Sequence, residues 1–89
     1  MGYGKIDFME INYTVKINPA AEGGFWAEVP ALPGCFTQGE TVQEATLMVK
    51  EAIESYLTSL LRRGEAFPVE KKARKGFAFP MVVRVPRLA

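Results

Sequence analysis

Residues 23–45 read GGFWAEVPALPGCFTQGETVQEA and contain the signals for two short strands, a turn and the start of a helix. Gly23 and Gly24 accept positive φ at little steric cost, which suits a hairpin turn before the first strand. Pro33-Gly34 is a turn dipeptide, so the chain must fold back before a second short strand at Cys35–Gln38. This stretch predicts a local topology and by itself indicates no chemistry.

The segment FWAEV is typical of a strand whose side chains alternate between two faces. The alternation places Phe25, Ala27 and Val29 on one face and Trp26 and Glu28 on the other.

A long helix is predicted from Val42 to Arg63. Thr41 and Glu44 form a T-x-x-E capping box at its start, and Gly64 suits a left-handed end. Apolar residues recur at steps of three and four and form one stripe: Val42, Ala45, Val49, Ala52, Ile53, Tyr56, Leu57 and Leu60. Leu47 and Leu61 lie beside this stripe, where a second molecule could contact them.

Two further strands flank this central part. Residues 10–18 alternate cleanly between apolar and polar side chains, and Pro19 ends the pattern. Residues 77–86 alternate again, and Pro80 and Pro86 indicate a strand at the edge of a sheet.

The predicted order is β-β-β-α-β, which is an α+β fold in a single domain, residues 1–89. We expect a four-stranded mixed sheet of order 3-2-1-4, with the last strand parallel to the first and the helix packed on one face. Residues 1–9 are predicted to form a flexible arm, and residues 65–76 a basic connection.

The composition argues against an enzyme. The 89 residues include no histidine and one cysteine, Cys35, so zinc clusters and histidine-dependent catalysis are unsupported. No paired carboxylates or phosphate-binding loop stand out, so we predict no catalytic residues, no metal and no cofactor. Cys35 is predicted to be a small buried residue. No stretch has the length of a membrane span or a signal peptide, so the expected location is the cytoplasm.

One helix can cover only one face of such a sheet. The other face would carry Trp26 and Phe36, and two exposed aromatic residues indicate an interaction surface. The alternative is that the N-terminal arm, with Tyr3 and Phe8, folds over them. An uncovered face and two open edges also predict self-association into a dimer or larger assembly.

Charge is distributed unevenly along the chain. Residues 1–60 contain three lysines and eight acidic residues, whereas residues 61–89 contain eight basic residues and two glutamates. An acidic helix face with Glu51 and Glu54 is one candidate surface for a basic partner. The basic residues Lys71, Lys72, Arg74 and Lys75 are candidates for nucleic-acid contact, although a solvated loop is the simpler explanation.

Residues 11–68 resemble the HicB-like antitoxin family. The resemblance rests on the double glycine before an aromatic strand, the E-x-P-x-L-P-G-C turn at Glu28–Cys35, the T-Q-G-E-T-x-x-E-A segment and a long helix that ends in R-R-G-E. It implies a truncated RNase H-like fold and a non-catalytic protein that binds and blocks a HicA-type toxin, an mRNA interferase.

The toxin surface is expected to be basic because it must attract RNA. We therefore expect Trp26 to anchor the contact, with Glu28 and Phe36 beside it, and the Glu51–Glu54 helix face as the alternative. Family members commonly carry a C-terminal DNA-binding segment, but this sequence ends soon after the last predicted strand. We thus expect no C-terminal DNA-binding domain and no specific DNA binding. A stand-alone oligomeric regulatory domain and a weak nucleic-acid binder remain alternatives.

Overall fold

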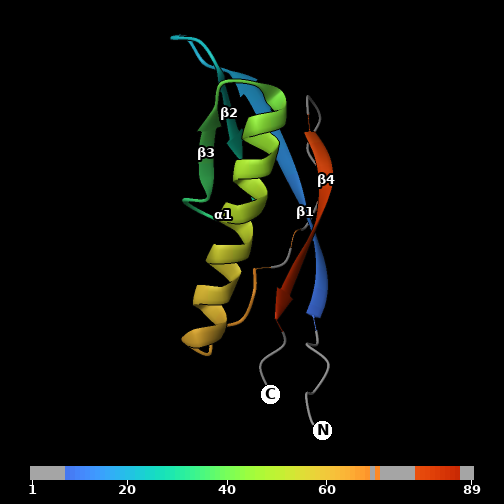
Figure 1. Ribbon diagram of the computed structural model, residues 1–89. Coiled ribbons are helices and arrows are strands. Elements are labelled where there is room, and N and C mark those ends of the chain that lie inside the picture. The colour runs from blue at the N-terminus through green and yellow to red at the C-terminus, as the bar shows by residue number, and fades with distance from the viewer. Residues whose placement is uncertain (1–7, 69, 71–77, 87–89) are drawn as a thin grey trace, which may run out of the picture.

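The computed structural model describes residues 8–68, 70 and 78–86, and its element order is the predicted β-β-β-α-β (Figure 1). The elements are β1 (Phe8–Pro19), β2 (Phe25–Glu28), β3 (Phe36–Gly39), α1 (Val42–Arg62) and β4 (Ala78–Pro86). Because β1 begins at Phe8, the last two residues of the predicted arm belong to a strand; residues 1–7 lie outside the described residues.

The four strands form one sheet of order β3-β2-β1-β4, as predicted, and α1 covers one face of it (Figure 1). The predicted direction of the last strand is wrong. β4 is antiparallel to β1, with Phe8 opposite Pro86 and Lys16 opposite Ala78, so the sheet is fully antiparallel and not mixed.

The connection after the helix explains this difference. A parallel β4 would have to start near the end of α1, but the chain first returns along the sheet. Pro68 and Glu70 contact Tyr13 and Thr14 in the middle of β1, and β4 then begins opposite Lys16. The connection is therefore long enough to reverse the direction in which the last strand enters the sheet.

Helix α1 begins and ends at the predicted signals. At its start the Glu44 N–H donates to Thr41 Oγ1 at 3.0 Å, while the Glu44 carboxylate accepts the N–H of Glu40 at 2.8 Å. At its end Gly64 has φ 69°, and the Glu65 N–H donates to the Leu60 carbonyl at 2.9 Å. These bonds satisfy backbone groups that a helix terminus would otherwise leave unpaired.

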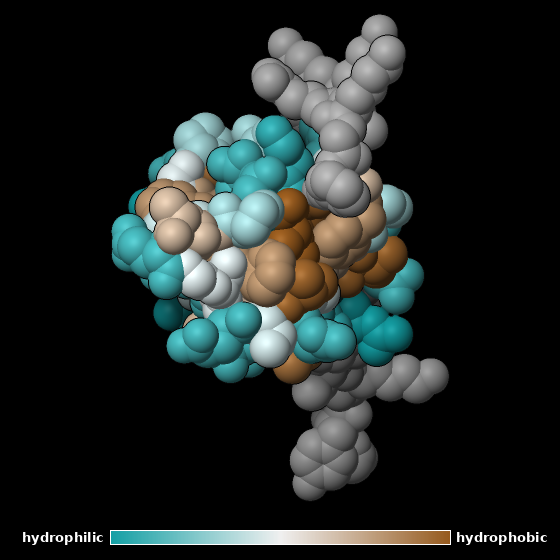
Figure 2. All heavy atoms as spheres, turned by 90° about the horizontal axis from the view of Figure 1, so that it is seen from above, coloured by the Kyte–Doolittle hydropathy of each residue, from teal (hydrophilic) through white to brown (hydrophobic). Residues whose placement is uncertain are grey.

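The buried side of α1 follows the predicted apolar stripe, with one exception. The fully buried positions are Ala45, Val49, Ile53, Leu57 and Leu60, and Ala52 and Tyr56 are partly buried against the core. Val42, which we expected in the stripe, is 45% exposed. It is the first residue of the helix, so its turn lies at the end of the molecule and is only partly covered. Figure 2 views this end and shows an apolar area surrounded by hydrophilic residues.

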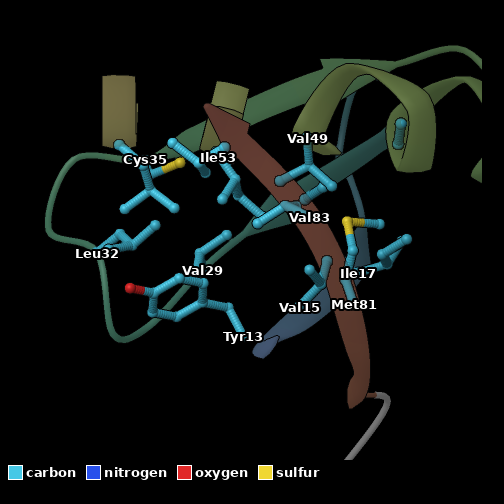
Figure 3. Packing of buried hydrophobic residues seen from close by; sticks show 14 of the residues in the cluster. Tyr13, Val15, Ile17, Val29, Leu32, Cys35, Val49, Ile53, Met81 and Val83 are labelled. Atoms are coloured by element: carbon cyan, nitrogen blue, oxygen red, sulfur yellow. The ribbon is translucent and has the colours of Figure 1, made fainter. Parts of the chain in front are cut away.

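The hydrophobic core lies between α1 and the sheet (Figure 3). Alternate residues of β1 enter it, which confirms the predicted inner face of Tyr13, Val15 and Ile17. The turn between β2 and β3 also contributes, because Leu32 and Cys35 point inward beside Val29. Cys35 is therefore buried, as the sequence predicted.

A close backbone contact fixes the start of the helix on the sheet. A Cβ atom built on Gly39 would lie 2.4 Å from the backbone nitrogen of Ala45 and 2.8 Å from its Cα. Real Cβ atoms do not approach a backbone this closely, so only glycine fits here without a shift. The residue that ends β3 thus lets the first turn of α1 lie directly against the strand.

Candidate partner-binding face

The sheet face opposite α1, called here the open face, carries an exposed aromatic pair. Trp26 is 39% exposed and Phe36 is 56% exposed, which confirms that both point away from the core. In the β2–β3 ladder Trp26 lies opposite Gln38 and Phe36 lies opposite Glu28, so the two rings are diagonal neighbours. Their centroids are 5.8 Å apart at an interplanar angle of 55°, a tilted arrangement that favours ring contact.

Glu28 is less available as an acidic contact than the sequence indicated. Its carboxylate lies 3.8 Å from Lys16 Nζ, and the two residues are opposite each other on β2 and β1. Both side chains are partly exposed, so the pair adds little stability. It does offset the negative charge beside the aromatic pair, which leaves the apolar area as the main feature of this face.

Glu70 covers the open face at the centre of β1. Thr14 points to this face but is only 6% exposed, because the Glu70 carboxylate lies on it. One carboxylate oxygen accepts the Thr14 backbone N–H and the other accepts the Thr14 hydroxyl, each at 2.6 Å. The aromatic pair therefore occupies its own part of the open face, to one side of this contact.

Tyr13, next to Thr14 in β1, points the other way, into the core. Its hydroxyl donates to the Pro68 carbonyl at 2.8 Å, which gives a buried phenol the partner it needs. Burial raises the pKa of Tyr13 above its usual value, and the nearby Glu70 carboxylate and Tyr56 raise it further. Together Tyr13 and Thr14 hold the connection to β1 on both sides of the strand.

Val82 is also exposed on the open face but belongs to a separate area. It lies opposite Asn12 on β1, whereas Trp26 lies opposite Asn18. Six residues of strand separate these two positions, which corresponds to roughly 20 Å. Val82 is thus a matched control position for tests of the aromatic pair.

The outer face of α1 lies on the opposite side of the molecule from the open face. Glu51 is exposed there, and Glu54 is half-buried. Leu47, which we expected to be available to a second molecule, is 65% exposed, whereas Leu61 packs against the core. The structure therefore does not bring these acidic residues together with Trp26 and Phe36.

Other predicted contacts lie outside the described residues. These are the basic candidates Lys71, Lys72, Arg74 and Lys75, and Tyr3 of the arm. The backbone of Phe8 pairs with Pro86 at the far end of β1 from Asn18, a distance of roughly 30 Å along the strand. The backbone of Phe8 therefore lies at the other end of β1 from the aromatic pair.

A shallow groove of about 500 Å³ separates the start of β3 from α1. It is lined by Gly34, Cys35, Phe36, Ala52, Ser55, Tyr56, Ser59 and Arg63. Burial raises the pKa of the Cys35 thiol, which disfavours the reactive thiolate. Within the described part of the chain no three histidine, cysteine or acidic side chains gather where they could hold a metal ion.

Sequence reasoning missed the two contacts that hold the connection. Tyr13 gave a signal, since a tyrosine on a buried strand face needs a partner for its hydroxyl. Thr14 gave none, because its partner Glu70 is separated from it by 56 residues.

No helix among the described residues has the length and apolar character needed to cross a membrane.

Comparisons with known proteins agree on one family. Residues 13–80 match the family described as the HicB-like antitoxin of bacterial toxin–antitoxin systems. A UPF0150 protein of Thermoplasma acidophilum is 48% identical over 58 residues, which are 65% of this chain and 84% of that protein. Antitoxin HicB of Escherichia coli K12 is 34% identical over 59 residues, which are 66% of this chain but only 43% of that protein.

Solved structures show the same fold. The N-terminal domain of Burkholderia pseudomallei antitoxin HicB aligns with a TM-score of 0.64 and 22% identity, covering 86% of this chain and all of that one. A chain from the HicA3 and HicB3 toxin–antitoxin complex aligns with a TM-score of 0.59 and 21% identity over the same share of this chain. With the family match over residues 13–80, these likenesses show that the chain belongs to the HicB-like antitoxin family.

Proposed function

We propose that this protein is a non-catalytic antitoxin domain that binds and blocks a HicA-type toxin through the open face of its sheet. Membership of the HicB-like family supports the class of partner. The observation that carries the choice of surface is the exposed Trp26–Phe36 pair, whose rings are 5.8 Å apart. On this proposal the protein acts in the cytoplasm, where an mRNA-cleaving toxin would act.

The aromatic pair suits a binding anchor for physical reasons. Tryptophan is enriched at the energetic centres of protein interfaces because its ring excludes water over a large area. The pair lies on a β-sheet, so it needs little ordering when a partner binds. Lys16 and Glu28 form a polar border next to it. The outer face of α1 offers Glu51 and Leu47 but no aromatic anchor among its described exposed residues.

The test is to measure the affinity of the purified protein for a HicA-type toxin, sought first among small basic proteins encoded beside its gene. Trp26→Ala should weaken the complex by about 2 kcal/mol or more, which is about thirtyfold in Kd. Phe36→Ala should have a smaller effect in the same direction. Val82→Ala, at an exposed position of the same face but about 20 Å away along the strand, should leave the Kd unchanged.

Two results would contradict the proposal. Trp26→Ala could bind with wild-type affinity while the double variant Glu51→Lys with Glu54→Lys loses binding, and then the helix face holds the toxin. If the domain binds no HicA-type toxin, it acts without one. In either case circular dichroism of Trp26→Ala must match the wild type, because Trp26 lies outside the core.

We further propose that the domain self-associates. The sheet has two edge strands, β3 and β4, and one face without a covering layer among the described elements. Open edges and uncovered apolar surface are the usual sites of association between copies.

A further inference from the structure

We propose that two copies of this chain join through the free edges of their β3 strands, in a twofold-symmetric antiparallel pairing centred on Thr37. This inference rests on the proposed self-association and states which edge carries it. It is independent of toxin binding, which uses the open face.

The hydrogen-bond pattern shows which backbone groups β3 leaves free. The Val29 N–H donates to the Cys35 carbonyl at 3.1 Å, and this pair continues the β2–β3 register by one residue. Bonded and non-bonded pairs alternate in an antiparallel ladder, so Thr37 bonds to Ala27. The N–H and C=O groups of Phe36 and Gln38 therefore point outward, away from β2.

The structure limits this free edge to a short segment. The next outward N–H belongs to Glu40, and it donates to the Glu44 carboxylate at 2.8 Å. The side-chain cap of the helix thus ends the edge. Phe36 and Gln38 remain, and each offers one free N–H donor and one free C=O acceptor.

The other edge of the sheet is obstructed. The Thr14 N–H points to the β2 side of β1, where Glu70 accepts it, so the alternate residues of β1 bond to β4. By the same alternation, Pro80 and Pro86 stand at outward positions of β4, opposite Thr14 and Phe8. Proline has no N–H to donate, and it is found on edges that must not pair. β3 has no proline and no charged residue.

The free groups of β3 are complementary to those of a second copy. If Phe36 of each copy lies opposite Gln38 of the other, all the outward groups pair in four backbone hydrogen bonds. Thr37 then faces Thr37 of the second copy across the twofold axis. A surface that matches itself in this way is what a symmetric dimer requires.

Thr37 lies at the twofold axis of this register. Within the part of the chain that the structure describes, its Oγ1 is the one buried side-chain oxygen or nitrogen without a hydrogen-bond partner. Directly opposed threonines of an antiparallel pair commonly hydrogen-bond to each other through their hydroxyls. Because Oγ1 is enclosed by its own chain, it must first turn outward about χ1, and the proposed register then places a second Thr37 hydroxyl within its reach.

The surroundings of the edge favour a second copy over a charged partner. The groove beside β3 is lined mainly by small or uncharged residues, including Ala52, Ser55 and Ser59. Its one charged residue, Arg63, pairs with Glu65 at 3.0 Å, so two copies would not repel each other there. On the open face, the pairing would join the two Trp26–Phe36 pairs into one apolar strip.

Variants at the two edges test this arrangement. Gln38→Pro removes an outward N–H from β3 and two of the four hydrogen bonds, so it should raise the dimer Kd by at least about thirtyfold. Val82→Pro is the matched control, because it removes an outward N–H from β4; the dimer Kd should stay within about twofold. Sedimentation velocity measures both, and circular dichroism checks that each variant folds.

A second pair of measurements reports the register. Thr37→Val should weaken the dimer by about twofold to fivefold without destabilising the monomer, since it removes an unpaired hydroxyl. Thr37→Cys in a Cys35→Ala background should form a disulfide between copies on oxidation. Residues of a non-bonded antiparallel pair have Cα atoms about 4.5 Å apart, which a disulfide can bridge.

Several outcomes would overturn the inference. If the wild-type protein stays monomeric, self-association itself is refuted. If it forms a dimer that Gln38→Pro does not weaken and that Thr37→Cys does not cross-link, only the choice of the β3 edge is refuted. If the wild type is monomeric and Gln38→Pro abolishes toxin binding, the edge holds the toxin and not a second copy. Trp26→Ala, which tests the open face, should leave dimerisation intact.

Discussion

Gly39→Ala should destabilise the domain strongly although the backbone at Gly39 needs no positive φ. The added Cβ would lie 2.4 Å and 2.8 Å from backbone atoms of Ala45, which cannot move aside as a side chain can. Overpacking of this kind costs about 3 kcal/mol. Replacing glycine also lowers the conformational entropy of the unfolded chain, which stabilises the folded state by about 0.5–1 kcal/mol. The net loss should be about 2 kcal/mol.

Urea unfolding followed by circular dichroism measures this loss. With an m value of roughly 1 kcal/mol per molar, the midpoint should fall by about 2 M. The melting temperature should fall by about 8–16 °C for a domain of this size. Gly34→Ala is the control: Gly34 has φ +80° but open space around its Cβ position, so only the backbone strain of about 1 kcal/mol applies. A smaller loss for Gly39→Ala than for Gly34→Ala would refute the reasoning.

Two further predictions concern the contacts of the connection. The raised pKa of Tyr13 means that the folded state holds this proton more tightly than the unfolded state, whose phenol titrates near 10.0. The protonated Tyr13 therefore contributes to the free energy of unfolding below pH 10.0, and this contribution should be lost as the pH rises through the folded-state pKa. In urea unfolding, Tyr13→Phe should make the free energy of unfolding less dependent on pH in this range. Thr14→Val and Glu70→Ala should each destabilise the domain, and their double-mutant cycle should give a coupling of about 2 kcal/mol. Additive losses would show that the contact contributes little.

Much of the fold could be predicted from local patterns. The alternation around Tyr13 and Val15 identified the buried face of β1, and the same alternation placed Trp26 on the outer face of β2. The capping residues Thr41 and Glu44 marked the start of the helix. Each of these signals lies within a few residues of the feature that it predicts.

What local patterns could not give was the path of the chain after the helix. The direction of β4 depends on where the connection runs, and that depends on the contact between Thr14 and Glu70. Nothing near either residue in the sequence indicates that contact. The free edge of β3 was equally hidden, because it depends on which residues of the ladder bond inward. The aromatic pair was predictable, but the ion pair that offsets the charge of Glu28 required the register of Lys16.

The pairing of β1 with β4 has a consequence for the order in which the protein forms during synthesis. β1 leaves the ribosome before the other strands, yet nine of its residues pair with β4, the last described strand. Until residues 78–86 emerge, one side of β1 remains unpaired, and the core lacks Met81, Val83 and Val85. The nascent chain therefore cannot complete its sheet until residues 78–86 have left the ribosome. We expect the incomplete chain to be the form most exposed to proteases and chaperones.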